Sequence, residues 1–276
     1  MTASVSWIAS YPRSGNTWLR FLIANCLSDH PFDWTGGLNA FAFELHFYRE
    51  MMLERGWDEA QTLDKLREVA AGQPTASSIG DQIFVKSHDL WSPTHTFAGH
   101  TRRAILLVRD PLDVLLSGLH YARLTRDYNG DDESYIRNYL ECGGDPAWIR
   151  MGYGSWSQHA KSWMNQDEFP VSVVRYEDLK SNTETELVKI CEFLELPVYR
   201  HLIDKAAEKS SMERLRKSEV EAREKGQFGG LRDGMFFINQ GRSGQNLSDV
   251  SPELDDLFEE QFADDMKMFG YDRRTV

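Results

Sequence analysis

Residues 9–18 have the sequence ASYPRSGNTW and lie where an apolar run gives way to a helical pattern. The apolar run occupies residues 5–9, and apolar side chains then recur at helical spacing, at Leu19, Leu22, Ile23 and Cys26. This pattern predicts a strand, a tight turn containing Pro12 and Gly15, and the N-terminus of a helix. Such a turn directs several backbone N–H groups to one point and adds the positive end of the helix dipole. The stretch therefore predicts a binding site for phosphate or sulfate.

The side chains of this loop suit the same role, because Arg13 supplies a positive charge and Ser14 and Thr17 supply hydroxyl groups. The loop is not a Walker A motif, since G-x-x-x-x-G-K-[ST] needs a second glycine followed by lysine and both are missing. From this stretch alone, an ordinary strand-to-helix turn without a ligand remains an alternative.

Length and composition favour one globular domain over residues 1–276, because the chain has no repeat, low-complexity tract or linker. The net charge of −12 argues against nucleic acid or an anionic membrane as a partner. No leader-like segment and no apolar run of about 18 residues occurs, so we expect a cytoplasmic protein without membrane contact. The three cysteines are too few and too scattered for a disulfide framework or a zinc site, so no metal is expected.

Two further apolar runs end in polar residues. Residues 104–108 form a continuous apolar run that stops at Arg109, and Asp110 with Pro111 then predicts the start of a helix. Residues 83–85 read as a short buried strand that ends at the sequence Lys86-Ser87-His88.

A fourth strand is predicted over residues 171–175, and residues 38–52 show a helical period. Residues 183–186 predict a capping box for a helix that follows this strand. Strands that alternate with helices indicate an α/β fold with a central parallel sheet flanked by helices in three layers, as in P-loop-like proteins. In such folds ligands bind at the carboxyl ends of the strands.

Together with the loop at Arg13, three ordered motifs make the chain resemble the sulfotransferases that use 3′-phosphoadenosine 5′-phosphosulfate (PAPS). They are Lys86-Ser87-His88, the R-x-x-x-D-x-x-x-S segment from Arg109 to Ser117, and the Y-E-D-L segment at Tyr176. The resemblance implies that His88 is the catalytic base and that Lys86 is also catalytic. In the transition state of sulfuryl transfer the moving group is loosely bonded, so catalysis depends on positioning and on stabilising the charge of the leaving 5′-phosphate and the sulfuryl oxygens. We assign these tasks to Arg13, Lys86 and the loop N–H groups.

The same resemblance implies a cofactor-binding set, and it requires no metal. The residues of this set are Arg13, Ser14, Gly15, Asn16, Thr17, Trp18, Arg109, Ser117, Tyr176, Ser210, Met212, Gly241 and Arg242. Trp18 corresponds to a surface for stacking adenine, although core packing is an equal alternative. Met212 stands where the family has an aromatic residue.

The chain departs from the family pattern in two further places. Arg13 stands where many members have lysine, and Asn239-Gln240 stands where a basic pair binds the 3′-phosphate of the nucleotide. Arg242 is the cation that we expect to replace this pair, with a surface loop as the alternative reading.

The sequence therefore predicts transfer of the sulfuryl group of PAPS to a hydroxyl of a small-molecule acceptor, with adenosine 3′,5′-bisphosphate (PAP) as the product. Aromatic residues in segments 31–57 and 121–153 favour a phenolic or partly apolar acceptor. Finer similarities are to bacterial sulfotransferases that modify natural products. Two alternatives are a P-loop-type kinase of a small metabolite and a non-catalytic nucleotide-binding protein of the same fold. The oligomeric state is open.

Overall fold

A computed structural model describes residues 4–27, 32–34, 42–71, 78–79, 82–125, 128, 130–227, 231–232, 234–238, 241 and 252–271.

The central sheet follows the order β2-β4-β1-β5-β6, and every neighbouring pair in this order is parallel. The strands are β1 (Ser4–Ser10), β2 (Phe43–Glu44), β4 (Gln82–Ser87), β5 (Thr101–Val108) and β6 (Val171–Arg175), with β3 (Ser78–Ile79) antiparallel to β4. Because the strands are parallel, the carboxyl ends of β1, β4 and β5 meet at one edge of the sheet. The loops that follow these three strands are therefore neighbours.

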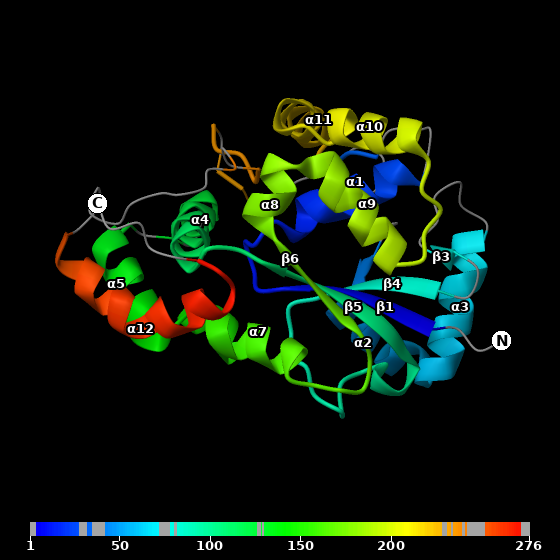
Figure 1. The fold of residues 1–276 in the computed structure, drawn as a ribbon, viewed down its shortest axis with the longest axis horizontal. Helices are drawn as coiled ribbons and strands as arrows, with labels where there is room; N and C mark the ends of the chain where they lie inside the picture. Colours follow the sequence, from blue (N-terminus) through cyan, green and yellow to red (C-terminus); the bar gives the residue numbers. More distant parts are fainter. Residues whose placement is uncertain are drawn as a thin grey trace.

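Helices cover both faces of the sheet (Figure 1). One face is covered by α1 (Asn16–Cys26), α8 (Tyr176–Ser181), α9 (Thr183–Phe193), α10 (Arg200–Lys209) and α11 (Met212–Glu224). The other is covered by α2 (Leu45–Arg55), α3 (Glu59–Ala71), α4 (Pro111–Leu124), α5 (Asp132–Cys142), α6 (Pro146–Arg150), α7 (Trp156–Met164) and α12 (Asp255–Met268). Two short 3-10 turns, Ala98–His100 and Pro252–Leu254, complete the described elements.

The alternation of side chains along the strands produces two separate apolar cores. Trp7 and Leu106 belong to the core beneath α7 and α12, whereas Ile8 and Ile105 belong to the core beneath α1 and α9. Successive residues of a strand point to opposite faces, so each strand contributes to both cores. The predicted three-layer α/β fold with a parallel sheet is confirmed.

The predicted start of α4 is confirmed in detail. The Asp110 side chain accepts hydrogen bonds from the N–H groups of Leu112 and Asp113, and Pro111 occupies the first turn. The capping box predicted over residues 183–186 is wrong. Thr183 is already helical and its hydroxyl donates to the carbonyl of Leu179, because α8 leads into α9 with only Asn182 between them.

A second correction concerns residues 38–52, where the sequence predicts a continuous helical period. The described part of this segment begins with Ala42, forms the short strand β2, and becomes helical only at Leu45. Pairing of Phe43 and Glu44 with β4 overrides the local helical pattern. Glu44 is thereby placed at the carboxyl edge of the sheet.

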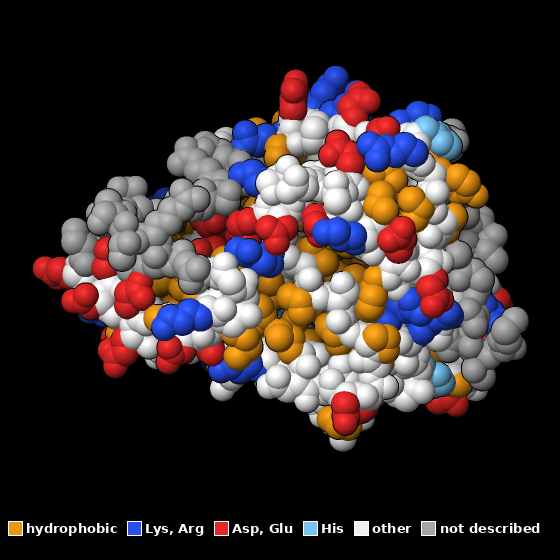
Figure 2. Space-filling model, in the orientation of Figure 1, with side chains coloured by type: hydrophobic (Ala, Val, Ile, Leu, Met, Phe, Trp, Pro, Cys, Tyr) orange, Lys and Arg blue, Asp and Glu red, His pale blue; other side chains and the backbone are white. Residues whose placement is uncertain are grey.

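The surface carries both signs of charge. On the face drawn in Figure 2, acidic and basic side chains are interspersed, and acidic ones gather at the end of the molecule formed by α5 and α12. Among the described helices, none is long and apolar enough to cross a membrane.

Candidate active site

The turn between β1 and α1 is built to expose backbone N–H groups. Gly15 and Arg13 have φ angles of 100° and 67°, both in the left-handed region. Gly15 is the N-cap of α1, which has neither a side-chain cap nor an acidic residue in its first turn. The hydroxyl of Ser14 is buried and makes no hydrogen bond within the described residues. An uncapped helix N-terminus beside an unsatisfied buried hydroxyl fits a bound anion.

A cavity of about 380 Å³ opens at the carboxyl edge of the sheet, beside this turn. Most of the predicted site residues line it: Arg13, Gly15, Asn16, Thr17, Trp18, Lys86, His88, Arg109, Ser117, Tyr176, Met212 and Gly241. Ser14 and Ser210 are buried beside it without lining it. Arg242 lies outside the described residues. The structure therefore brings together residues from four separate sequence motifs.

His88 follows the last residue of β4 and faces this cavity. Its Nδ1 lies 2.6 Å from the carbonyl oxygen of Ser10 at the end of β1. Because a carbonyl only accepts, Nδ1 carries the proton and Nε2 is the nitrogen with a free lone pair. Burial, and then the charge of Lys86, hold the pKa of His88 well below 6.5. The imidazole is thus neutral and able to accept a proton.

Lys86 lies on β4, two residues before His88, and forms an ion pair with Glu44 of β2. Burial lowers the pKa of Lys86, and Glu44 opposes this effect. Burial would raise the pKa of Glu44, but Lys86 brings it below its usual value. The pair keeps a buried ammonium charged at the cavity wall.

Two arginines meet on the α4 side of the cavity. The Nε of Arg13 donates to the Ser117 hydroxyl at 3.2 Å, and Arg109 donates from Nη1 to the Arg13 carbonyl at 3.0 Å. The Arg109 guanidinium also lies 4.5 Å from the centre of the Tyr176 ring. Burial, and then the charge of Arg109, lower the pKa of Arg13 to about 10, so the Arg13 side chain remains charged. Two arginine side chains thus contribute to this part of the cavity wall.

Aromatic and apolar side chains next to Arg109 form another part of the wall. The Trp18 ring packs edge-on against Tyr176, with ring centres 5.5 Å apart, and its Nε1 donates to the carbonyl of Ser210. The Ser210 hydroxyl accepts a hydrogen bond from Asn25, so this serine supports the wall from behind. Met212 completes the wall.

Several lining residues were not assigned as site residues from the sequence. They are Glu44, Tyr121, Trp148, Met151, Tyr153, Phe237 and Ile238. Tyr121, Trp148 and Tyr153 fall in the segment whose aromatic content predicted an acceptor pocket. Glu44 was not predicted as a site residue because the residues around it show a helical period, and a strand end was not expected there.

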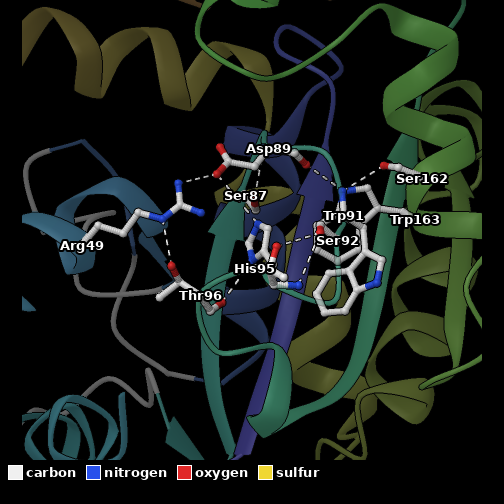
Figure 3. Close-up of polar contacts among 10 residues, drawn as sticks. Arg49, Ser87, Asp89, Trp91, Ser92, His95, Thr96, Ser162 and Trp163 are labelled. Atoms are coloured by element: carbon white, nitrogen blue, oxygen red, sulfur yellow. Dashed lines mark hydrogen bonds and ion pairs between the residues drawn. The ribbon is translucent and has the colours of Figure 1, made fainter. Parts of the chain in front are cut away.

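Helix α2 is tied to the segment that carries His88 (Figure 3). Arg49 of α2 forms an ion pair with Asp89, with Nη1 and Oδ2 2.5 Å apart, and its Nε donates to Thr96. The backbone carbonyl of Asp89 accepts a hydrogen bond from Trp163 of α7. Asp89 directly follows His88, so α2 and α7 together fix the backbone at His88.

Among the residues that the structure describes, no group of three or more His, Cys, Asp or Glu side chains is placed to hold a metal ion.

Both the sequence and the fold of the chain are similar to those of known proteins. The family model described as "Sulfotransferase domain" matches residues 4–270. Sulfotransferase 1B1 of Canis lupus familiaris is 26% identical over 214 residues, which cover 76% of this chain and 65% of that protein. A 3-alpha-hydroxysteroid sulfotransferase of Cavia porcellus is 25% identical over 219 residues, covering 76% of this chain and 66% of that protein. The chain thus spans just under two thirds of the length of these relatives.

Two solved structures share the fold. A mouse sulfotransferase complexed with PAP superposes with a TM-score of 0.63 at 19% identity, covering 97% of this chain and 84% of that one. A retinol dehydratase in complex with androsterone and the inactive cofactor PAP gives a TM-score of 0.65 at 18% identity, covering 99% and 83%.

Proposed function

The chain belongs to the sulfotransferase domain family, and from this premise we propose that it transfers the sulfuryl group of PAPS to a hydroxyl group of a small molecule. The observation that carries the proposal is the position of His88, a neutral imidazole that lines the same cavity as the anion-binding turn and Lys86. A site that only binds a nucleotide needs no such base. The family match over residues 4–270 supports one domain across residues 1–276.

The residues present fit a nucleotide with phosphates at both ends. The N–H groups at the start of α1 and the unsatisfied Ser14 hydroxyl suit the 5′-phosphosulfate, and Arg109 with Ser117 suits the 3′-phosphate. Trp18, Tyr176, Met212 and Gly241 line the part of the cavity that suits adenosine. When bound, PAPS supplies the activated sulfuryl group. Two solved proteins of this fold contain PAP, which supports the same donor here.

His88 acts as the general base in this proposal. Its Nδ1 proton is held by the Ser10 carbonyl, so Nε2 takes the proton of the acceptor hydroxyl as that oxygen attacks sulfur. The hydrogen bond to the Ser10 carbonyl keeps the ring oriented, which avoids the cost of positioning it during the reaction.

Lys86 stabilises the negative charge that develops on the departing 5′-phosphate. Its ammonium is buried at the cavity wall, where a charge acts more strongly than it does in water. The ion pair with Glu44 keeps the Lys86 ammonium protonated at the cavity wall in the absence of nucleotide.

The acceptor is an alcohol or phenol with an apolar body. Trp148, Met151 and Tyr153 line the cavity, and the rings of His88 and Tyr153 are 5.8 Å apart. Such walls favour flat or hydrophobic molecules with one polar group. The androsterone bound by a structural relative is likewise an alcohol with an apolar body.

The experiment that tests this function uses radiolabelled PAPS with panels of phenols, sterols, sugars and hydroxylated peptides. We expect label to appear in at least one phenol or apolar alcohol, together with PAP. Label that moves instead from the γ-position of ATP in the presence of magnesium would identify a kinase.

Gly15 provides a first prediction, because an added Cβ would lie 2.6 Å from Cδ2 of Tyr176 and its φ is 100°. The Gly15→Ala variant should lose about 1–3 kcal/mol in free energy of unfolding and should bind PAP weakly in calorimetry. Gly56→Ala is the matched control, because Gly56 has a φ of 66° and nothing within 4 Å of its Cβ position. That control should keep full PAP affinity. Normal PAP binding by Gly15→Ala would contradict the placement of the nucleotide against this turn.

Arg49 provides a second prediction, since it acts on His88 only through Asp89. Arg49→Ala should lower kcat by about 10- to 100-fold through misplacement of the base, with little change in KM for PAPS. Arg49→Lys keeps the charge and should recover part of the loss. Arg55→Ala, which removes an exposed arginine from the same helix, is the control. A change confined to thermal stability, with kcat intact, would reduce Arg49 to a structural residue.

A further inference from the structure

The guanidinium of Arg13, which the family motif assigns to the 5′-phosphate, makes its described contacts elsewhere. Its contacts are with α4 and with residue 237. Nε donates to Ser117, Nη2 donates to the carbonyl of Phe237 at 3.0 Å, and the group lies between the rings of Tyr121 and Phe237 at 5.0 and 4.7 Å from their centres. Within the described residues it forms no ion pair with a carboxylate.

This arrangement leaves a second place for an anion in the same cavity. Arg13 and Arg109 both line this part of the cavity, and the charge of Arg109 lowers the pKa of Arg13. An anion bound near both side chains would be attracted by two positive charges. Ser117 accepts from Arg13, so its own hydroxyl proton is available to a ligand. Both hydrogens on Nη1 of Arg13 also remain available, since its described contacts use Nε and Nη2.

The position of Arg13 is supported by a buried carboxylate on α11. Glu219 has no exposed surface and accepts hydrogen bonds from the N–H groups of Phe237 and Ile238, at 2.6 and 3.1 Å. Arg223, one turn along α11, forms an ion pair with Glu219. The carbonyl and ring of Phe237 that hold Arg13 are therefore fixed in place, and so is the guanidinium.

These contacts connect the two departures from the family pattern. The chain has arginine in place of lysine at position 13 and lacks the basic pair at residues 239–240. Building on the proposed function, we propose that Arg13 binds the 3′-phosphate together with Arg109 and Ser117, and that it makes the protein select nucleotides that carry this phosphate. The longer, forked side chain reaches from the first loop to α4, where the missing pair would have supplied charge.

The test compares two ligands, PAP and adenosine 5′-monophosphate, which differ only in the 3′-phosphate. Calorimetry on Arg13→Gln should show the preference for PAP reduced by about 10- to 100-fold, the worth of charge-assisted hydrogen bonds. Binding of the monophosphate should change less than threefold or so, because its phosphate lies at the start of α1. Arg137→Gln, at an exposed position of α5, is the matched control and should keep the preference of the unmodified protein.

A preference for PAP that is unchanged in Arg13→Gln would overturn the proposal. If, in addition, both ligands bind more weakly by the same factor, Arg13 contacts the 5′-phosphate that they share. If Arg13→Gln does not fold, Arg13→Lys tests the same point, because lysine cannot keep both contacts of the fork and should also lose preference. Failure of the unmodified protein to bind either ligand would instead contradict the proposed function itself. The two failures are thus distinguishable.

Discussion

Replacing His88 by alanine is expected to lower kcat for sulfuryl transfer by about a hundred- to ten-thousand-fold, the usual worth of a general base. Nucleotide affinity should stay within about threefold of the unmodified protein, because the turn at Gly15 and the arginines, and not the imidazole, hold the phosphates. Steady-state kinetics and PAP calorimetry on the same preparation measure both quantities. His201→Ala, at an exposed position on α10, controls for the loss of an imidazole elsewhere.

The pH dependence gives the same prediction a second readout. The neutral form of His88 is active and its pKa lies well below 6.5, so kcat/KM should remain flat as the pH falls through 6.5 and decline only in more acidic solution. This acid limb should disappear in His88→Ala. Near-normal turnover by that variant, or an acid limb that persists in it, would remove His88 from the proposed chemistry and revive the non-catalytic alternative.

Lys86→Ala is the second large effect, with an expected loss of about a hundred- to a thousandfold in kcat, as for the removal of one preorganised group that stabilises developing charge. The ammonium form is the active one and burial lowers its pKa, so activity of the unmodified protein should fall with rising pH before 10.5 is reached. Steady-state rates across the alkaline range measure this limb.

Lys65→Ala is the control for this variant, because Lys65 is an exposed lysine of α3 that pairs with Glu68 on the same helix. Its kinetics should match those of the unmodified protein. If Lys86→Ala raises KM for PAPS and leaves kcat intact, Lys86 contributes only to ground-state binding, and the stabilisation of the leaving phosphate falls to the loop N–H groups alone.

The sequence was sufficient for the parts of the site that follow strong local patterns. The apolar runs before Arg13, Lys86 and Arg109 predicted three strand ends, and parallel pairing brings these ends together as expected. The Asp110–Pro111 start of α4 was predictable because a cap is a local interaction. These elements depend on neighbours in the sequence, so periodicity and capping rules find them.

The features that the sequence did not predict depend on distant contacts. Glu44 belongs to a two-residue strand that forms only against β4, so the helical period around it was misleading. The side chain of Arg13 turns to α4 because Ser117 and Phe237, more than a hundred residues away in the sequence, supply its partners. Neither contact has a local sequence signature.

The most direct test of the central claim is calorimetric titration of the purified protein with PAP, because it does not require knowledge of the acceptor. We predict one binding site per chain with micromolar or tighter affinity, weakened in Gly15→Ala and retained in His88→Ala. The absence of binding heat at PAP concentrations that saturate related sulfotransferases, verified at a second temperature, would contradict the account.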